Sequence, residues 1–384
     1  MNRRRAAIGA AVGLAAVVAL AVWWFSAAPP RGPIRASIVV SEALGGDTGG
    51  FSRALTPRAF AFPADAGPHP DFRTEWWYYT GNLETATGRH VGFQLTFFRT
   101  ALAPRAIEVR RASAWATTQV YLAHFAVTDT EGRSFRAWSR TSREGIGLAG
   151  AQAQPFRVWL EDWSATADGD AAVRLRASEG DVGIDLVLGT RGRLVLQGDR
   201  GLSRKGPEPG NASYYYSMPR MPARGTVELD GVQHAVTGLV WMDREWSTSA
   251  LGRDLIGWDW FALMLDDGRD LMVYRLRRRD GSPDPLSAGT LVSPDGRVER
   301  LGRDDVAIEV LDHWTSPQSR VRYPSRWRVD VPSAELHLEV SPRLPDQELD
   351  VGTRYWEGAV RAEGEVAGRS VTAKGYVELV GYGD

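Results

Sequence analysis

The chain contains no cysteine among its 384 residues. Disulfides, thiolate metal sites, iron–sulfur clusters and cysteine nucleophiles are therefore excluded. Lysine is scarce too, because Lys205 and Lys374 are the two lysines among 46 basic residues. With 47 acidic residues, the net charge is −1, which gives no overall field to attract a polyanion. We therefore expect no nucleic-acid partner.

Motifs for phosphate, zinc and serine-hydrolase chemistry are also missing. The sequence holds no glycine-rich phosphate loop, no HExxH helix and no GxSxG elbow. The histidines, at positions 69, 90, 124, 234, 313 and 337, are scattered without a pair at ligand spacing. We expect neither a metal nor another cofactor.

The first residues read as a targeting segment. Three arginines, Arg3 to Arg5, precede the uncharged run Ala6 to Phe25, which is about as long as a bilayer core is thick. Because the positive flank stays in the cytoplasm, the rest of the chain should cross. We expect a signal-anchor over residues 1–28, or a signal peptide cleaved after Ser26-Ala27-Ala28. The protein would then be periplasmic, tethered to the inner membrane through residues 29–55, or secreted after cleavage.

The remaining sequence is typical of β-strands. Short β-branched and aromatic runs alternate with turn signals, and Asp-Gly pairs at 230–231, 267–268, 280–281 and 295–296 favour hairpins. No segment after residue 50 has a helical period longer than about three turns. Two strand series are separated near residues 245–255, so we expect two β-domains, 56–247 and 248–384.

Aromatic residues are the unusual abundance, with 15 tryptophans. In Glu75-Trp-Trp-Tyr-Tyr-Thr-Gly81, strand alternation would place Glu75, Trp77 and Tyr79 on one face and Trp76, Tyr78 and Thr80 on the other. This segment is either the wall of a cavity with a carboxylate at its mouth or a strand with aromatic packing on both faces.

Two further segments place carboxylates between tryptophans. In Trp241-Met-Asp-Arg-Glu-Trp246, Asp243 and Glu245 would share a face, as an acid–base pair or as part of an ion-pair clamp with Arg244. Asp259, between Trp258 and Trp260, would be a proton donor or would bind an indole or Arg275.

Two other features have open interpretations. The run Tyr214-Tyr-Tyr216 is interpreted as an edge strand in preference to a pocket entrance. His124 lies in an apolar strand. It could act as a base, but a histidine in this position is more commonly a hydrogen-bonded core residue.

These motifs together resemble the AttH/CrtC family, which contains carotenoid 1,2-hydratases and lipocalin-like proteins described as secreted hydrolases. The resemblance covers about residues 58–384 and rests on the segments above with Ser203-Arg-Lys-Gly206, Asp346-Gln-Glu-Leu349, Tyr355-Trp-Glu-Gly358 and Gly375-Tyr-Val-Glu-Leu379. It implies an all-β fold of two tandem lipocalin-like antiparallel barrels. The hydratase pattern has His-x-Trp and Tyr-x-Asp, where this chain has Arg244-Glu-Trp246 and Tyr274-Arg-Leu276.

We therefore expect an exported protein that binds a hydrophobic small molecule or lipid. It would act as a cofactor-independent hydratase or hydrolase, or alternatively as a non-catalytic carrier that serves an ABC-transporter permease of the lipoprotein-release type. A structural role without a cavity is the third interpretation. The expected catalytic residues are Asp243, Glu245 and Asp259. The expected ligand contacts are Glu75, Trp76, Trp77, Tyr79, His124, Tyr215, Arg244, Trp246, Trp258, Trp260, Tyr274 and Trp356.

Overall fold

The structure is a computed structural model that describes residues 48–105, 117–248, 251–252 and 254–383. The expected N-terminal helix lies outside the described residues. Within these ranges, no helix has the length and apolar character needed to span a bilayer. The described residues all belong to one compact unit, Ile38–Asp384.

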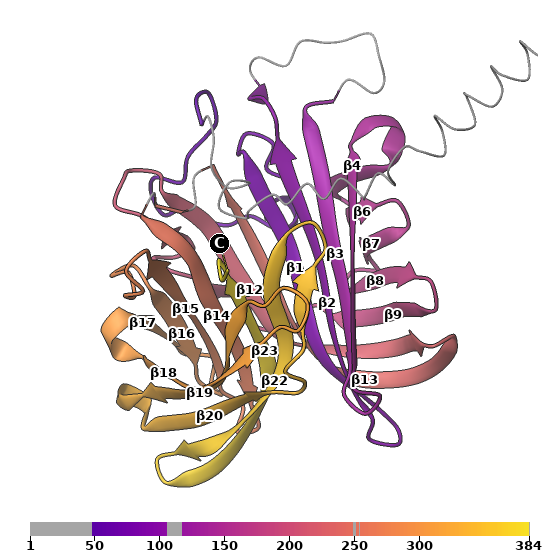
Figure 1. The fold of residues 1–384 in the computed structure, drawn as a ribbon. Helices are drawn as coiled ribbons and strands as arrows, with labels where there is room; N and C mark the ends of the chain where they lie inside the picture. Colours follow the sequence, from indigo (N-terminus) through magenta and orange to yellow (C-terminus); the bar gives the residue numbers. More distant parts are fainter. Residues whose placement is uncertain (1–47, 106–116, 249–250, 253, 384) are drawn as a thin grey trace, which may run out of the picture. The chain divides into compact units, whose positions relative to one another are not determined.

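The described chain forms two antiparallel sheets (Figure 1). The strands of the first are β1 (Thr74–Thr85), β2 (His90–Ala101), β3 (Gln119–Asp129), β4 (Ser134–Arg143), β5 (Ala149–Ala153), β6 (Phe156–Leu160), β7 (Trp163–Ala167), β8 (Ala172–Glu179), β9 (Val182–Gly189), β10 (Val195–Leu196), β11 (Leu202–Arg204), β12 (Ala212–Leu229) and β13 (Val232–Ser247). Those of the second are β14 (Leu255–Leu265), β15 (Asp270–Arg278), β16 (Ala288–Val292), β17 (Val298–Gly302), β18 (Ala307–Thr315), β19 (Arg322–Val331), β20 (Leu336–Pro342), β21 (Glu348–Asp350), β22 (Arg354–Val366) and β23 (Arg369–Val380). The helical elements in this part of the chain are 3₁₀ turns, η1 (Ala64–Ala66), η3 (Gly145–Gly147), η4 (Arg303–Asp305) and η5 (Pro332–Ala334). The all-β prediction is therefore confirmed.

The Asp-Gly pairs lie in the connections where they were expected. Asp230-Gly231 joins β12 to β13, and both residues have positive φ, 53° and 76°. Two positive φ values in a two-residue loop define a turn whose twist matches that of the strands. The other pairs connect β14 to β15, β15 to β16 and β16 to β17. These local signals explain the hairpin order of the second sheet's first half.

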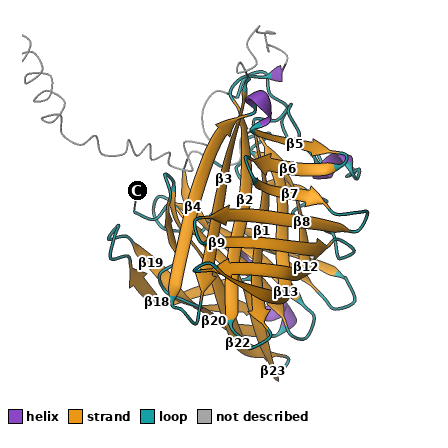
Figure 2. Cartoon of the chain, turned by 90° about the vertical axis from the view of Figure 1, so that its right-hand side faces the viewer, coloured by secondary structure: helices purple, strands orange, loops and turns teal. Residues whose placement is uncertain are grey.

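The first sheet curls around its own apolar face. In Figure 2, β8, β9 and β12 cross in front of β1 to β4. Arg140 of β4 closes the curl by ion pairs with Asp162 and Glu179, and its guanidinium lies 4.3 Å above the Trp163 ring. The strand order runs from β4 through β1, β13 and β9 to β5, so these contacts bring distant parts of the order together. The outcome is a barrel-like body with an enclosed core.

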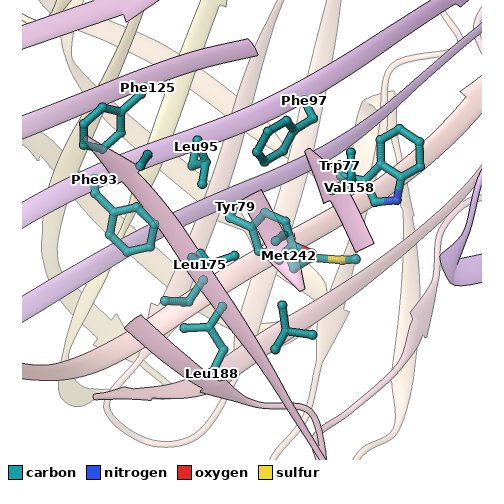
Figure 3. Packing of buried hydrophobic residues seen from close by; sticks show 14 of the residues in the cluster. Trp77, Tyr79, Phe93, Leu95, Phe97, Phe125, Val158, Leu175, Leu188 and Met242 are labelled. Atoms are coloured by element: carbon teal, nitrogen blue, oxygen red, sulfur yellow. The ribbon is translucent and has the colours of Figure 1, made fainter. Parts of the chain in front are cut away.

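The core inside this curl is formed by large side chains at alternate positions along the strands. Trp77, Tyr79 and Phe93 are fully buried there with Met242 close by (Figure 3). Each such side chain contributes about 2–3 kcal/mol by leaving water. The predicted alternation along β1 is observed, because Trp77 and Tyr79 enter this core while Trp76 and Tyr78 pack on the opposite face.

The second sheet curls around a core of its own. Phe261 of β14 meets the Trp327 ring of β19 edge-on at 5.5 Å, and Trp356 packs beside Trp327. Leu263, Val273 and aliphatic residues of β20 and β22 fill the rest of this interior. Each sheet therefore has one face committed to its own core, which leaves the other face of its central strands for a different contact.

The tyrosine run is not at a sheet edge, so that interpretation was wrong. Tyr214 to Tyr216 lie in β12, which pairs with β13 along one side. On the other side the same residues pair with β10 and β11. Because the short strands β10 and β11 come from the loop before β12, sequence alone did not reveal that this edge is covered.

Candidate functional site

The outward faces of the central strands of the two sheets are joined by side-chain contacts. Tyr215 of β12 accepts a hydrogen bond from the indole of Trp260 of β14, at 3.3 Å. The Tyr78 and Trp260 rings meet edge-on at 5.3 Å. We call the side chains between β1, β2, β3, β12 and β13 on one side and β14, β15, β22 and β23 on the other the inter-sheet layer. This layer is aromatic and apolar in most of its contacts, but it also holds several carboxyl groups.

Asp243 is held in the inter-sheet layer by three donors. Its Oδ1 accepts hydrogen bonds from Trp241 Nε1 at 2.7 Å and Ser217 Oγ at 2.5 Å. Its Oδ2 accepts one from the Tyr215 hydroxyl at 2.5 Å. Burial raises the pKa of Asp243 to about 7, although these donors oppose the rise. The carboxyl can therefore hold or release a proton near neutral pH.

Glu245 lies on the same face, as the alternation predicted. It accepts a hydrogen bond from Ser213, and Lys205 Nζ lies 3.6 Å from its Oε1. The Lys205 ammonium also stands 3.8 Å above the Tyr274 ring. Burial lowers the pKa of Lys205, but Glu245 and Tyr274 outweigh that effect and the net shift is upward. Lys205 is therefore a cation with its charge already neutralised.

Glu357 and Glu378 are a second pair of acidic side chains in the layer. They are direct cross-strand partners, and Glu378 in turn stands opposite Trp260. Burial and the neighbouring Glu378 raise the pKa of Glu357 well above its usual range, an effect that Tyr78 and Tyr355 moderate. Burial also raises the pKa of Glu378 to about 7, against a hydrogen bond from Trp258 Nε1 at 2.9 Å. Burial and the neighbouring Glu378 therefore favour the protonated form of Glu357.

His124 connects the two sheets at the other side of the layer. Its Nδ1 hydrogen bonds with the Tyr355 hydroxyl at 2.7 Å. Burial lowers the pKa of His124 to about 4, so the imidazole is neutral at physiological pH. Its Nε2 is buried and has no hydrogen-bond partner among the described residues. The ring is thus half-satisfied, with one nitrogen available to a further group.

The predicted site residues fall into three separate places. The inter-sheet layer holds eight of them, namely Trp76, His124, Tyr215, Asp243, Glu245, Trp258, Trp260 and Tyr274. The first sheet's interior holds Glu75, Trp77, Tyr79, Arg244 and Trp246. The second sheet's interior holds Asp259 and Trp356.

Glu75 lies in a buried ion network. It pairs with Arg99 and Arg244, which hold the pKa of its carboxyl far below its usual range against the effect of burial. Arg244 also stacks 4.0 Å over the Trp77 ring. His69 is stacked on Trp246 at 3.7 Å. The geometry gives Glu75 and Arg244 a bracing role between the barrel-like body and the segment that precedes β1.

Asp259 is also fully paired. Arg275 and Arg277 approach its two oxygens at 2.6 and 3.1 Å, and the Tyr382 hydroxyl donates to Oδ1 at 2.8 Å. The alternative that Asp259 binds Arg275 is therefore observed. Trp356 donates its indole hydrogen to the Pro345 carbonyl at 2.8 Å inside the second core.

Sequence reasoning missed Glu357, Glu378, Tyr78 and Tyr355 as site residues. A signal existed, because Glu357 and Glu378 are single carboxylates inside apolar strands, the criterion that drew attention to Asp259. Which of such carboxylates has a cationic partner depends on register and facing, which one strand's sequence does not contain. Among the residues described, no cluster of three or more histidine and carboxylate side chains could hold a metal ion.

Comparison with known proteins gives a consistent family relationship. The family model described as AttH-like matches residues 53–382. The crystal structure of an AttH protein from Nitrosomonas europaea superposes with a TM-score of 0.76 at 36% identity, over 86% of this chain and 100% of that one.

Two more distant relatives have names that state an activity. Kievitone hydratase from Nectria haematococca superposes with a TM-score of 0.66 at 14% identity, over 86% of this chain and 96% of that one, so this match shows the fold. Dehydratase asqC from Emericella nidulans is 24% identical over 227 residues, which is 56% of this chain. The match spans 62% of that dehydratase's length.

Proposed function

This chain belongs to the AttH-like family, and from that premise we propose that it is a hydratase or dehydratase acting on a lipophilic substrate in the inter-sheet layer. Two relatives are named a hydratase and a dehydratase, which supports this reaction class. The observation that carries the proposal is the unequal pair Glu357 and Asp243, buried among aromatic rings. Burial and Glu378 raise the pKa of Glu357 well above its usual range, whereas burial raises the pKa of Asp243 to about 7.

The chemistry needs no cofactor. Protonated Glu357 donates its proton to one carbon of a C=C bond, and Asp243, as the anion, takes a proton from the water that adds to the other carbon. Glu357 is then a carboxylate and Asp243 a carboxylic acid, so the proton must return. The Tyr78 hydroxyl is the group placed to relay this proton from Asp243 to Glu357, because Tyr78 is the cross-strand neighbour of Asp243 and its hydroxyl faces Glu357. The reverse sequence of steps eliminates water.

Other layer residues have supporting roles in this proposal. Trp76, Trp258 and Trp260 form apolar walls, and Glu245 is held by Lys205 at the end of the layer. We leave Asp259 out of the catalytic set, because it is paired with two arginines on the other face of β14. Glu75 is left out for the same reason.

The finer description of fold and location is part of the same proposal. Each curled sheet would be a lipocalin-like barrel, in tandem over 56–247 and 248–384. Residues 1–28 would hold the protein at the periplasmic face of the inner membrane, where an ABC-transporter permease is the proposed partner. Fractionation of cells that express either the full chain or the chain without residues 2–28 tests this. The full chain should sediment with membranes, and the shortened chain should not.

The test of activity uses ¹⁸O-labelled water. Purified full-length protein is incubated with a lipid extract of its native host in this water, and the products are analysed by mass spectrometry. We expect species that gain one labelled water, and species that lose water, with wild type. Asp243→Asn and Glu357→Gln should abolish both changes. Tight extraction of a lipid with no mass change in any sample would instead favour the non-catalytic carrier.

A further inference from the structure

Unsatisfied polar atoms gather at one side of the inter-sheet layer. They are the hydroxyl oxygens of Tyr78 and Thr80, Gln94 Oε1, His124 Nε2 and both carboxyl oxygens of Glu357. All are buried, and none makes a hydrogen bond of normal geometry within the described residues. The Tyr78 and Tyr355 hydroxyls nevertheless lie close enough to Glu357 to lower its pKa, so Thr80 Oγ1, Gln94 Oε1 and His124 Nε2 are the atoms that most lack a partner. A native protein leaves few such atoms, because each costs about 1–3 kcal/mol. Their concentration therefore points to a place where a ligand supplies the missing partners.

These atoms are neighbours by register and by contact. Thr80 pairs across the ladder with Gln94, and Tyr78 with Thr96, whose other partner is His124. Gln94 Nε2 donates to Thr96 Oγ1 at 2.6 Å, which leaves its Oε1 available. From the other sheet, Tyr355 hydrogen bonds with His124 and is a neighbour of both Gln94 and Glu357.

The set contains both donors and acceptors. The hydroxyls of Tyr78 and Thr80 donate, as does a protonated Glu357, whereas Gln94 Oε1 only accepts. A hydroxyl group is both donor and acceptor, so it can satisfy Gln94 and one of the donors together. A hydrocarbon would satisfy none of these atoms. The hydrogen-bonding pattern is therefore matched to an alcohol or phenol.

The charges of the layer argue against an anion. The groups that act most strongly on Tyr78, Tyr355 and Glu357 include the acids Glu357, Glu378 and Asp243, and no cation. Lys205 lies in the layer but is paired with Glu245. Arg244 and Arg275 point away, toward Glu75 and Asp259. An anionic head group would lose its hydration here without gaining an opposite charge.

From this arrangement we infer that the inter-sheet layer selects an uncharged, hydroxyl-bearing lipophilic molecule and rejects its carboxylate counterpart. The hydroxyl is held by Gln94, Thr80 and His124 opposite Glu357, and the hydrocarbon lies against the tryptophans. This inference rests on the proposed function for the location of the site, and it adds the chemical class of the substrate.

The test compares two probes of one skeleton. Geraniol and geranate differ in having a hydroxymethyl or a carboxylate end, and binding is measured by equilibrium dialysis with full-length protein in nanodiscs at pH 7.5, with empty nanodiscs as the blank. We expect geraniol to bind at least about tenfold more tightly, equivalent to about 1.4 kcal/mol. Equal or tighter binding of geranate, or no binding of either above the blank, would overturn the inference.

Variants locate the preference. Gln94→Leu should weaken geraniol binding by about fivefold to tenfold, because the hydroxyl loses its acceptor. Gln233→Leu, at an exposed position of β13, is the matched control and should bind as wild type. If Gln94→Leu does not fold, Thr80→Val tests the same hydroxyl contact. A preference for geraniol that is unchanged by both layer variants would contradict the assignment.

The two proposals can fail separately. The ¹⁸O experiment reads water addition and the dialysis experiment reads binding preference. Turnover of host lipids together with a preference for geranate would remove only the substrate class. A geraniol preference that depends on Gln94, without any turnover, would remove the hydratase and leave a binding protein for neutral alcohols.

Discussion

Glu357 of β22 and Glu378 of β23 stand directly opposite each other in an antiparallel ladder and point into the inter-sheet layer. Like charges at opposed positions destabilise a sheet, and burial increases that cost. The pair therefore keeps a proton that two exposed glutamates would lose at neutral pH. An enzyme that must protonate an unactivated carbon needs such an acid in a dry environment.

The first prediction concerns the pH dependence of stability in Glu357→Gln. A carboxyl whose pKa is raised in the folded state makes a protein less stable as pH rises above the unfolded value of 4.5. Glutamine mimics the protonated form at every pH. The variant should therefore gain stability relative to wild type as pH increases from 5 to 9, as measured by urea unfolding. Glu363→Gln, exposed on the same strand, should give a constant difference. A constant difference for Glu357→Gln would show that the carboxyl is ionised throughout.

The second prediction separates bracing from catalysis. Glu75→Gln leaves Arg99 and Arg244 buried with one partner fewer, and should lower the free energy of unfolding by about 3–5 kcal/mol. Glu84 lies on the same strand as Glu75 and forms an exposed ion pair with Lys374. Glu84→Gln should therefore lower the free energy of unfolding by less than about 1 kcal/mol. Because the Glu75 carboxyl has a lowered pKa, its contribution should fade as pH drops below 4.5. Equal unfolding midpoints for the two variants at pH 7 would contradict the bracing role.

The third prediction compares two aspartates. Asp243→Asn should reduce turnover by at least about 100-fold, the usual range for a lost acid–base group. Asp259→Asn should retain the turnover of its folded fraction but lose about 2–4 kcal/mol of stability, because Arg275 and Arg277 lose an anionic partner. The measurements are ¹⁸O incorporation per folded molecule and urea unfolding. Loss of turnover in folded Asp259→Asn, with Asp243→Asn active, would reverse the assignment.

The fourth prediction concerns His124. Burial lowers its pKa from 6.5 to about 4, so its ring should remain neutral at pH 5.5. ¹⁵N NMR of labelled histidine reads this directly. In linkage, a histidine with a lowered pKa contributes stability that is present above 6.5 and is lost as pH falls toward 4. His124→Gln should therefore lose less stability than wild type between pH 6.5 and pH 4. Protonation of His124 near pH 6.5 would show that the ring is accessible to water.

Local patterns predicted much of the fold. Alternation assigned Trp77 and Tyr79 to one face of β1 and Trp76 to the other, and it placed Asp243 and Glu245 together. The Asp-Gly pairs marked hairpins because positive φ is required there whatever the tertiary context. These features depend on neighbours within a few residues, which is the range that sequence patterns describe.

The site depended on relations of longer range. Glu357 faces Tyr78, which is nearly 300 positions away in the sequence, because two sheets pack through their outward faces. Strand β1 carries two large aromatic rings on each face. Its composition therefore did not show which face packs into a core and which face contacts the other sheet. Asp259 and Glu357 are both single carboxylates within apolar strands, so they look alike in the sequence. Only the structure shows that Arg275 is paired with Asp259. Deciding which acid keeps a proton required the three-dimensional arrangement.

The most direct test of the account is infrared spectroscopy of the carboxyl groups at pH 7.5. Wild type should show the C=O stretch of a protonated, weakly hydrogen-bonded carboxylic acid, and this band should shift in deuterated water. Glu357→Gln should remove most of this band and leave only the smaller contribution of Asp243 and Glu378, whose pKa values lie near 7, while Glu363→Gln leaves the band unchanged. A wild-type spectrum with only ionised carboxylates at this pH would contradict the claim that the inter-sheet layer holds a protonated acid, and with it the proposed chemistry.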